Sequence, residues 1–306
     1  MKRKSVIPAA LVAALALAAC GGGDDPLAES PDGGETGGAA GEVIVGSANF
    51  PGNVLLAEVY AAALEDAGVS VTKRLNIGSR ETYVAGLEDG SIDLMPEYTG
   101  ALDLYFNPET EASDPQEIYD DLVENLPDGL TVLEPAEAED KDAIVVTAET
   151  AEELGLTTIA DLAPHAPNLV LGGPPEFADR FTGVPGLSEV YGLEFASFRP
   201  LQAGSNLTVQ ALLNGQVDAA NIFTADPSIA ENNLVVLEDP ENLFAAQNIV
   251  PVIRTDALND TVEATLNEVS AALTTDALSE LMSRVVTEGE DPAAVARDFV
   301  DRELGG

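Results

Sequence analysis

The sequence predicts an α/β protein built as two lobes around a shared cleft. Three observations support this prediction: strands and helices alternate within residues 43–95, a twelve-residue pattern occurs twice, and the folded part is long. That part comprises about 265 residues, which is more than one typical hydrophobic core organises, so two lobes are expected.

The first half of the chain has the spacing of a parallel sheet with right-handed crossovers. Its expected elements are a strand at 43–47, a helix at 53–67, a strand at 69–75, a helix at 80–87, a strand at 91–95 and a helix at 114–125. Gly68 ends the first helix. Asp114 and Pro115 favour the start of the last one, as N-cap and first helical residue.

The chain is expected to change lobe near Asp140 and to cross back within residues 250–254. The expected elements of the second lobe are strands at 143–147, 169–171, 216–222 and 234–237 and helices at 149–154 and 207–213. Three amphipathic helices, at 262–273, 276–286 and 292–303, return to cover the first lobe. The predicted boundaries are 43–140 plus 249–306 for lobe 1 and 141–248 for lobe 2. Two interlobe crossovers make a hinge, and a hinge makes a closing cleft.

The repeated pattern places one aromatic residue in each lobe. Leu87 to Tyr98 and Leu212 to Phe223 share a leucine, a glycine at +3, an aspartate at +6 and an aromatic at +11. Each copy predicts a helix end, a glycine stop, a buried strand and a ring just past the strand. Ligands of open α/β sheets lie beyond such strand ends, so both rings are expected to face the cleft. The alternative is that these common units only pack their rings in the core.

The first 42 residues are predicted to be a targeting segment and a tether. Three basic residues precede an apolar stretch that is short for a membrane span, and Leu17-Ala-Ala-Cys20 is typical of a bacterial lipobox. Residues 1–19 are therefore expected to be a signal peptide, and Cys20, the only cysteine, the lipidation site. An ordinary secretory signal with a chance cysteine is the alternative. Residues 20–42 are rich in glycine and acid, as in a disordered tether. The expected location is extracytoplasmic, lipid-anchored to the outer face of the cell membrane.

Charge and motifs exclude several classes of function. With 13 Lys plus Arg against 54 Asp plus Glu, the net charge is −41 at pH 7, which excludes nucleic acid and anionic lipid surfaces as direct partners. We attribute the charge to an acidic, solvated surface. His165, the only histidine, lies in a loop without a nucleophile motif, and the chain has no phosphate loop, dinucleotide fingerprint or metal-ligand cluster. We expect no enzyme activity, cofactor or metal.

Scarce basic residues point to the chemistry of the cleft. Lobe 2 has only Lys141, Arg180 and Arg199, and Arg180 follows a strand-to-helix loop. A guanidinium there would hold a carboxylate with two hydrogen bonds, or else form a surface ion pair with one of the many acids. Ring faces attract a cation that donates no hydrogen bonds, such as trimethylammonium. Rings together with an arginine therefore describe a site for a zwitterion such as a betaine.

Six segments between residues 43 and 254 carry a family resemblance. They are Val45-Gly-Ser-Ala-Asn-Phe50, Asn76-Ile-Gly78, Pro96-Glu-Tyr-Thr-Gly100, Gly172-Gly-Pro-Pro-Glu-Phe177, Phe223-Thr-Ala-Asp226 and Leu237-Glu-Asp239. The chain resembles the glycine betaine/choline/carnitine-binding lipoproteins of ABC-type osmoprotectant importers. The resemblance implies a monomeric periplasmic-binding-protein (venus flytrap) fold that closes on its ligand and docks to a permease driven by a cytoplasmic ATPase.

The resemblance also implies roles for five residues. Tyr98 and Phe223 fall on tyrosines of the family's cation cage, although Phe223 lacks the hydroxyl. Arg180 falls on the arginine that binds the ligand carboxylate. Asn53 falls on a polar residue at the start of the first helix, and Asp140 on a polar residue of the interlobe strand.

Three positions depart from the family pattern. Asp142 and Gln247 stand where the family has tyrosines, and Ala101 stands where it has a threonine. Two rings then replace four, with Asp142 as a possible counter-charge to the ligand. The leading hypothesis is a receptor for a quaternary-amine osmolyte. The alternatives are the same fold binding another small polar solute, such as an amino acid, or a lipoprotein that senses a ligand and signals to a partner.

Overall fold

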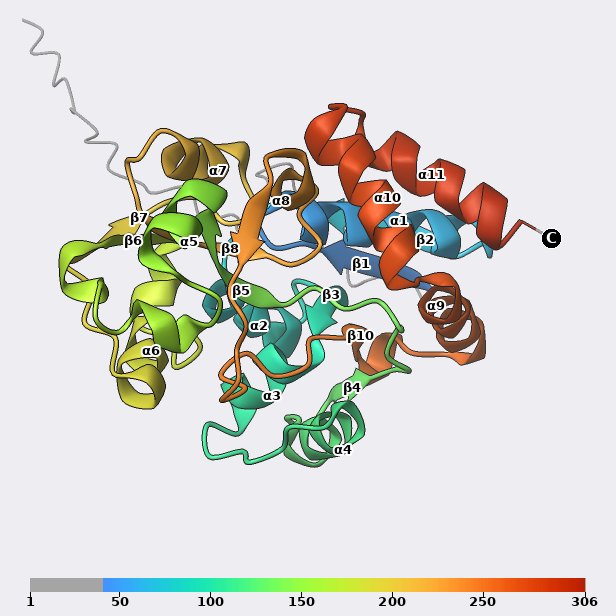
Figure 1. Ribbon diagram of the computed structural model, residues 1–306. Helices are drawn as coiled ribbons and strands as arrows, with labels where there is room; N and C mark the ends of the chain where they lie inside the picture. Colours follow the sequence, from blue (N-terminus) through green and yellow to red (C-terminus); the bar gives the residue numbers. More distant parts are fainter. Residues whose placement is uncertain (1–40, 306) are drawn as a thin grey trace, which may run out of the picture.

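The computed structural model describes residues 41–305, which form two lobes, each with one five-stranded sheet and surrounding helices (Figure 1). The predicted α/β class is confirmed. The predicted signal peptide, the lipidation site Cys20 and nearly all of the predicted tether lie outside the described residues. Within residues 41–305, every helix is too short or too polar to traverse a lipid bilayer.

Lobe 1 holds the two chain ends of the described part. Its strands are β1 (Glu42–Gly46), β2 (Ser70–Arg74), β3 (Leu94–Tyr98), β4 (Leu130–Val132) and β10 (Ile249–Arg254). They lie in the order β2-β1-β3-β10-β4, with β1 parallel to β2 and β3 and with β10 antiparallel to β3 and β4. Its helices are α1 (Pro51–Asp66), α2 (Arg80–Asp89), α3 (Thr99–Phe106), α4 (Pro115–Asn125), α9 (Asp260–Ala272), α10 (Thr275–Met282) and α11 (Pro292–Glu303), with the turns η4 (Thr255–Ala257) and η5 (Ser283–Thr287).

Lobe 2 repeats this sheet arrangement. Its strands are β5 (Asp142–Thr147), β6 (Val170–Gly173), β7 (Ser197–Pro200), β8 (Ala219–Phe223) and β9 (Leu234–Val236), in the order β7-β6-β8-β5-β9. Strand β6 is parallel to β7 and β8, and β5 is antiparallel to β8 and β9. Its helices are α5 (Ala148–Leu154), α6 (Val184–Tyr191), α7 (Asn206–Leu213) and α8 (Ser228–Glu231), with the short turns η1 (Ile159–Leu162), η2 (Ala166–Asn168) and η3 (Pro175–Ala178).

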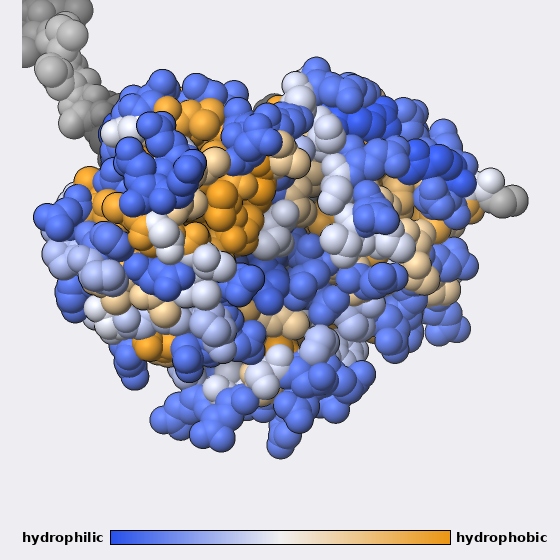
Figure 2. Space-filling model, viewed as in Figure 1, coloured by the Kyte–Doolittle hydropathy of each residue, from blue (hydrophilic) through white to orange (hydrophobic). Residues whose placement is uncertain are grey.

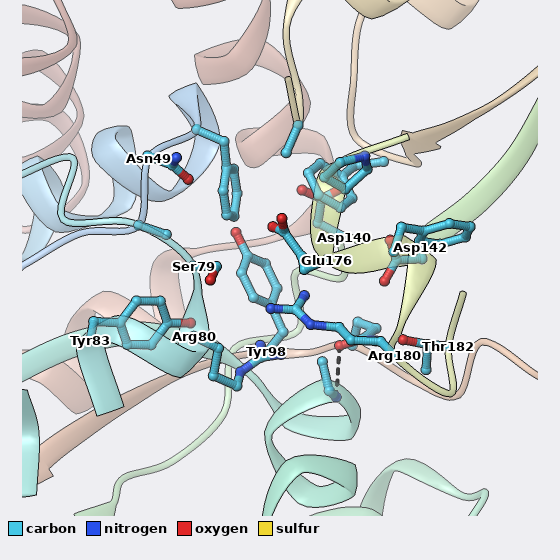
Figure 3. Close-up of a pocket in the computed structure, with 18 residues that line it drawn as sticks. Asn49, Ser79, Arg80, Tyr83, Tyr98, Asp140, Asp142, Glu176, Arg180 and Thr182 are labelled. Atoms are coloured by element: carbon cyan, nitrogen blue, oxygen red, sulfur yellow. Dashed lines mark hydrogen bonds between the residues drawn. The ribbon is translucent and has the colours of Figure 1, made fainter. Parts of the chain in front are cut away.

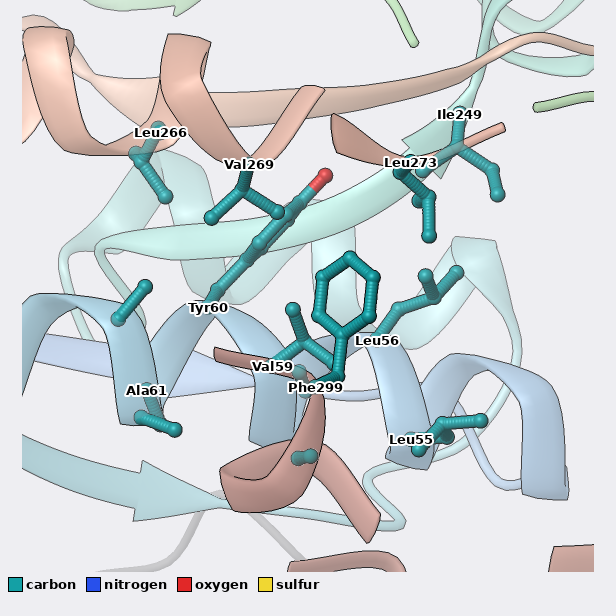
Figure 4. Close-up of a cluster of buried hydrophobic side chains, with 14 of the residues drawn as sticks. Leu55, Leu56, Val59, Tyr60, Ala61, Ile249, Leu266, Val269, Leu273 and Phe299 are labelled. Carbon is teal, nitrogen blue, oxygen red and sulfur yellow. The ribbon is translucent and has the colours of Figure 1, made fainter. Parts of the chain in front are cut away.

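The core of lobe 1 surrounds helix α1. Figure 4 shows Tyr60 and Phe299 packed among aliphatic side chains of α1, α9 and α11, and both rings are almost fully buried. The sheet covers one side of α1 and the C-terminal helices cover the other, so this alanine-rich helix is apolar all round rather than amphipathic. The prediction that the last three helices return to lobe 1 is confirmed. The surface is mostly hydrophilic in the view of Figure 2, as the acidic composition requires.

The two copies of the repeated pattern have the same structure. Gly90 and Gly215 both adopt left-handed backbone, with φ of 82° and 63°, at the ends of α2 and α7. Asp93 accepts a hydrogen bond from the amide of Ile44 in β1, and Asp218 accepts one from Val170 in β6. Each aspartate therefore ties its strand to the neighbouring parallel strand, which explains the shared acid of the pattern.

The expected ends of β3 and β8 were wrong by a few residues. Both strands start and finish later than predicted, so Tyr98 and Phe223 are the last residues of their strands rather than residues just beyond them. The helices α3, α6 and α8 and the strands β4 and β7 were not predicted. Asp114 caps α4 as expected, because its side chain accepts from the amide of Gln116.

Two connections join the lobes, after β4 and after β9, and they pair with each other. Glu139 and Asn248 form an antiparallel bridge, and the amide of Asp140 donates to the carbonyl of Gln247 at 3.2 Å. Gly100 lies against this pair: a Cβ there would sit 2.5 Å from the carbonyl oxygen of Ala246. The close approach therefore requires glycine.

Candidate functional site

A pocket lies between the lobes, at the hinge and at the ends of β3 and β8. It encloses a cavity of about 60 Å³. Lobe 1 and the hinge contribute Ala48, Asn49, Phe50, Ser79, Arg80, Tyr83, Tyr98, Ala101, Asp140 and Gln247, and lobe 2 contributes Asp142, Pro174, Glu176, Phe177, Arg180, Thr182, Ala203 and Phe223. Figure 3 shows these side chains converging from both sides. Six of the seven predicted binding residues therefore meet in one place.

Three aromatic rings form one wall of the pocket. The ring centroid of Phe50 lies 6.2 Å from that of Tyr98 and 5.2 Å from that of Phe223. Phe50 follows β1 in lobe 1, whereas Phe223 ends β8 in lobe 2, so the ring row crosses the cleft. The sequence analysis missed Phe50 as a site residue. Its signal was present in the sequence, since Phe50 comes shortly after the strand expected at 43–47, as Tyr98 and Phe223 come shortly after the strands expected at 91–95 and 216–222.

The hydroxyl of Tyr98 is buried and has no hydrogen-bond partner within residues 41–305. Burial, and then the negative charge of Asp140, raise the pKa of Tyr98 well above its usual value. The phenol is therefore neutral and retains a free donor near the pocket.

Three carboxyl groups face the same cavity: Asp140, Asp142 and Glu176. Asp140 accepts from the amide of Ala225 at 2.8 Å, and Asp142 accepts from the side chain of Asn221 at 2.9 Å. Burial raises the pKa of Asp140 to about 7, assisted by the neighbouring charge of Asp142, although the Ala225 amide opposes the shift. Burial also raises the pKa of Asp142. Burial thus disfavours ionisation of Asp140 and Asp142, and a cation bound beside them would favour their charged forms.

Arg180 projects from the loop after η3, and its guanidinium is already engaged. Its Nε and Nη2 atoms donate to the two carboxylate oxygens of Glu81, both at 3.0 Å. Glu81 lies in α2 of lobe 1, so this ion pair spans the two lobes. Both interpretations from the sequence, a pocket arginine and an ion pair with an acid, describe part of its environment.

A second arginine, Arg80, lines the pocket from lobe 1. It donates to both oxygens of the fully buried Glu97, at 2.8 and 2.7 Å, and Tyr83 donates to Glu97 at 2.6 Å. The backbone amide of Tyr98 donates to Glu97 as well, at 3.0 Å. This network holds the strand end that carries Tyr98, a positioning role that the sequence did not reveal.

Asn53 lies apart from the other predicted binding residues. Asn53 is fully buried and is not among the described residues that line the pocket. Its amide accepts from the amide of Ala48 at 2.7 Å and donates to the carbonyl of Pro96 at 2.9 Å. These contacts tie the loop before α1 to β3, so Asn53 positions the loop that carries Phe50. A polar residue that begins a helix serves the backbone as readily as a ligand.

The structure places Gln247 at the pocket and His165 away from it. Gln247 lines the pocket, and its side-chain oxygen accepts from the amide of Ala101 at 3.1 Å, drawn as the dashed line in Figure 3. His165 immediately precedes η2 in lobe 2 and is not among the residues that line the pocket. Over the described range 41–305, no cluster of three or more His, Cys, Asp or Glu side chains has an arrangement that would hold a metal ion.

Comparison with known proteins gives consistent results. Residues 41–302 match the family model of the substrate binding domain of ABC-type glycine betaine transport systems. The chain is 31% identical over 270 residues to a glycine-betaine-binding protein of Pseudomonas aeruginosa, covering 84% of this chain and 86% of that protein. It is 27% identical over 279 residues to the glycine betaine-binding protein YehZ of Escherichia coli, covering 87% and 92% of the two chains.

A solved structure supports the fold. The crystal structure of a glycine betaine/carnitine/choline ABC transporter protein superposes with a TM-score of 0.67 at 24% identity, over 86% of this chain and 98% of the other. The likeness confirms the predicted two-lobe arrangement with a cleft between the lobes.

Proposed function

Because this chain belongs to the family of substrate-binding domains of ABC-type glycine betaine transport systems, we propose that its interlobe pocket binds a quaternary-amine osmoprotectant of the glycine betaine, choline or carnitine type. The protein would then deliver this solute to a membrane permease driven by an ATPase. Substrate-binding proteins of such importers work outside the cytoplasm, which is the location we assign to this chain.

The observation that carries the proposal is the ring row of Tyr98, Phe50 and Phe223 beside unpaired carboxylates. A trimethylammonium group donates no hydrogen bonds, so a protein holds it by ring faces and by negative charge. Asp142 and Glu176 supply the charge, and Phe50 adds a third ring to Tyr98 and Phe223. The cavity of about 60 Å³ is smaller than the ~150 Å³ that accommodates a benzene-sized molecule, so ligand entry requires the lobes to separate slightly.

Several finer parts of the proposal follow from the sequence. We propose that Cys20 is acylated after removal of residues 1–19, and that residues 20–42 tether the protein to the outer face of the membrane. We also propose a monomer with lobe boundaries at 43–140 plus 249–306 and at 141–248. Mass spectrometry of the membrane-extracted protein tests the acylation, since a Cys20→Ser variant would lack the added lipid mass.

A second candidate ligand is a solute with a primary ammonium group, such as an amino acid. Asp142 and Glu176 are hydrogen-bond acceptors that a trimethylammonium group leaves unused, whereas an ammonium group donates three hydrogen bonds. This candidate keeps the fold and the cleft and changes only the occupant.

Thermal unfolding of the full chain in detergent, with glycine betaine, choline, carnitine, glycine, proline and ectoine, decides between these candidates, because glycine carries the primary ammonium group. A ligand present at about a hundred times its dissociation constant stabilises by ~2.7 kcal/mol, which raises the unfolding temperature by several degrees. We expect such a shift with a quaternary amine, and a roughly tenfold weaker affinity for Tyr98→Ala in calorimetry. A shift with proline or another solute alone would refute the quaternary-amine assignment.

A further inference from the structure

The arginine expected to hold a ligand carboxylate already holds one from the protein. Arg180 contributes two donors to Glu81, and the planar guanidinium matches the carboxylate as a two-pronged pair. The hydroxyl of Ser79 donates to the same carboxylate at 2.6 Å. Although partial burial opposes it, these hydrogen bonds lower the pKa of Glu81 to about 2, so Glu81 is ionised at neutral pH.

Glu81 reaches Arg180 from outside the pocket. Glu81 lies in the neighbouring groove, whereas Arg180 lines both that groove and the pocket. The side chain of Arg180 is 31% exposed and that of Glu81 is 48% exposed, so neither is locked in the core. The pair is therefore accessible to competition from a ligand carboxylate that approaches from the pocket side.

The remaining charges of the pocket do not favour an anionic group. Arg80, the other guanidinium, is neutralised by the buried Glu97. Asp140, Asp142 and Glu176 form no ion pair with any Lys or Arg in the described part of the chain. A ligand carboxylate placed here meets three carboxyl groups, and its natural partner Arg180 is occupied.

We propose that Glu81 is a specificity-determining residue: by occupying Arg180 it makes the pocket select a quaternary ammonium cation with an uncharged, hydroxylated tail over a zwitterion with a carboxylate. Arg180 uses two of its five N–H donors for Glu81, so a zwitterion must either displace Glu81 or share the guanidinium with that second negative charge. An amino-alcohol cation does neither. The proposal rests on the proposed function, since it concerns the tail of a ligand whose ammonium group occupies the ring wall.

Calorimetric titration with choline and with glycine betaine tests the proposal directly. Three full-length proteins are compared: the wild type, Glu81→Gln, which keeps the shape of Glu81 but removes its charge, and Glu88→Gln, a matched change at an exposed acid of the same helix. We expect the wild type to bind choline at least tenfold more tightly than glycine betaine. Glu81→Gln should reduce this ratio tenfold or more by strengthening betaine binding, and Glu88→Gln should leave it unchanged.

A double-mutant comparison identifies the route of the effect. In an Arg180→Gln background, Glu81→Gln should no longer strengthen betaine binding, because the guanidinium that it would release is gone. Equal wild-type affinities for both ligands, or the same ratio in Glu81→Gln and Glu88→Gln, would overturn the role of Glu81 and leave the quaternary-amine site intact. Binding of neither amine to the wild type or to Glu81→Gln would overturn both proposals.

Discussion

Replacing Phe50 by leucine tests the ring wall at the ring that joins the other two. Leucine keeps an apolar side chain but removes the π face, and Phe50 is half-buried, so the fold should tolerate the change. A cation over one ring in a partly desolvated site gains ~0.5–2 kcal/mol, which corresponds to about 2- to 30-fold in affinity. Phe50 contacts both Tyr98 and Phe223, so its loss also releases the other rings, and we expect the upper half of that range.

The assay is calorimetric titration with choline and with its uncharged analogue, in which a tert-butyl group replaces trimethylammonium. Phe50→Leu should weaken choline binding roughly tenfold and affect the analogue by less than about threefold, because only the cation uses the ring charge distribution. Phe181→Leu is the matched control, since Phe181 is 45% exposed and lines the neighbouring groove rather than the pocket. Equal losses for both ligands would refute cation recognition and indicate simple packing, and unchanged choline binding would remove Phe50 from the site.

Three further predictions concern stability. Tyr98→Phe removes a hydroxyl without a partner among residues 41–305, so unfolding of the ligand-free protein in urea should be unchanged or slightly harder, and a loss above about 1 kcal/mol would contradict this. Phe299→Ala opens a cavity beside Tyr60 and should destabilise by about 3–5 kcal/mol in the same assay, whereas a loss below 1 kcal/mol would show that the core collapses around it. Folding raises the pKa of Asp140 from 3.8 to about 7, so the folded state holds a proton that the unfolded chain releases above about pH 4. Its stabilising contribution is complete below pH 4 and is lost as the pH rises through 7. Asp140→Asn should therefore flatten the fall in stability between pH 4 and 7 by up to about 1.4 kcal/mol per pH unit, and identical slopes would refute the shift.

The sequence predicted the elements that local chemistry determines. Gly90 and Gly215 mark helix ends because only glycine adopts left-handed backbone at little energetic cost, and Asp114 marks a helix start because its side chain caps an amide. The shifted ends of β3 arise from partners far along the chain, because Tyr98 pairs with Ile249. A short apolar run in the sequence does not define the end of a strand, because that end depends on the strand with which it pairs.

The site was predictable where a residue type and a strand end coincided, as for Tyr98 and Phe223. The role of a residue was not predictable where a partner far away in the sequence determines it. Glu81 is one acid among 54, and only the fold brings it to Arg180, 99 residues later in the chain. Asn53 shows the opposite case, since its residue type suits a ligand but two backbone groups occupy it.

Two rings of the pocket, Tyr98 and Phe223, pair in the sheets with the strands next to the hinge. Tyr98 lies opposite Ile249, and Phe223 lies opposite Asp142, so each ring is paired in the sheet with the strand that enters or leaves the hinge. Tyr98 and Phe223 therefore belong to strands whose backbone hydrogen bonds do not depend on the identity of the side chain. The side chains of Tyr98, Phe223 and Asp142 can therefore be exchanged without changing the backbone pairing beside the hinge. Substitution can thus change the ligand that the pocket binds while the backbone pairing at the hinge is retained.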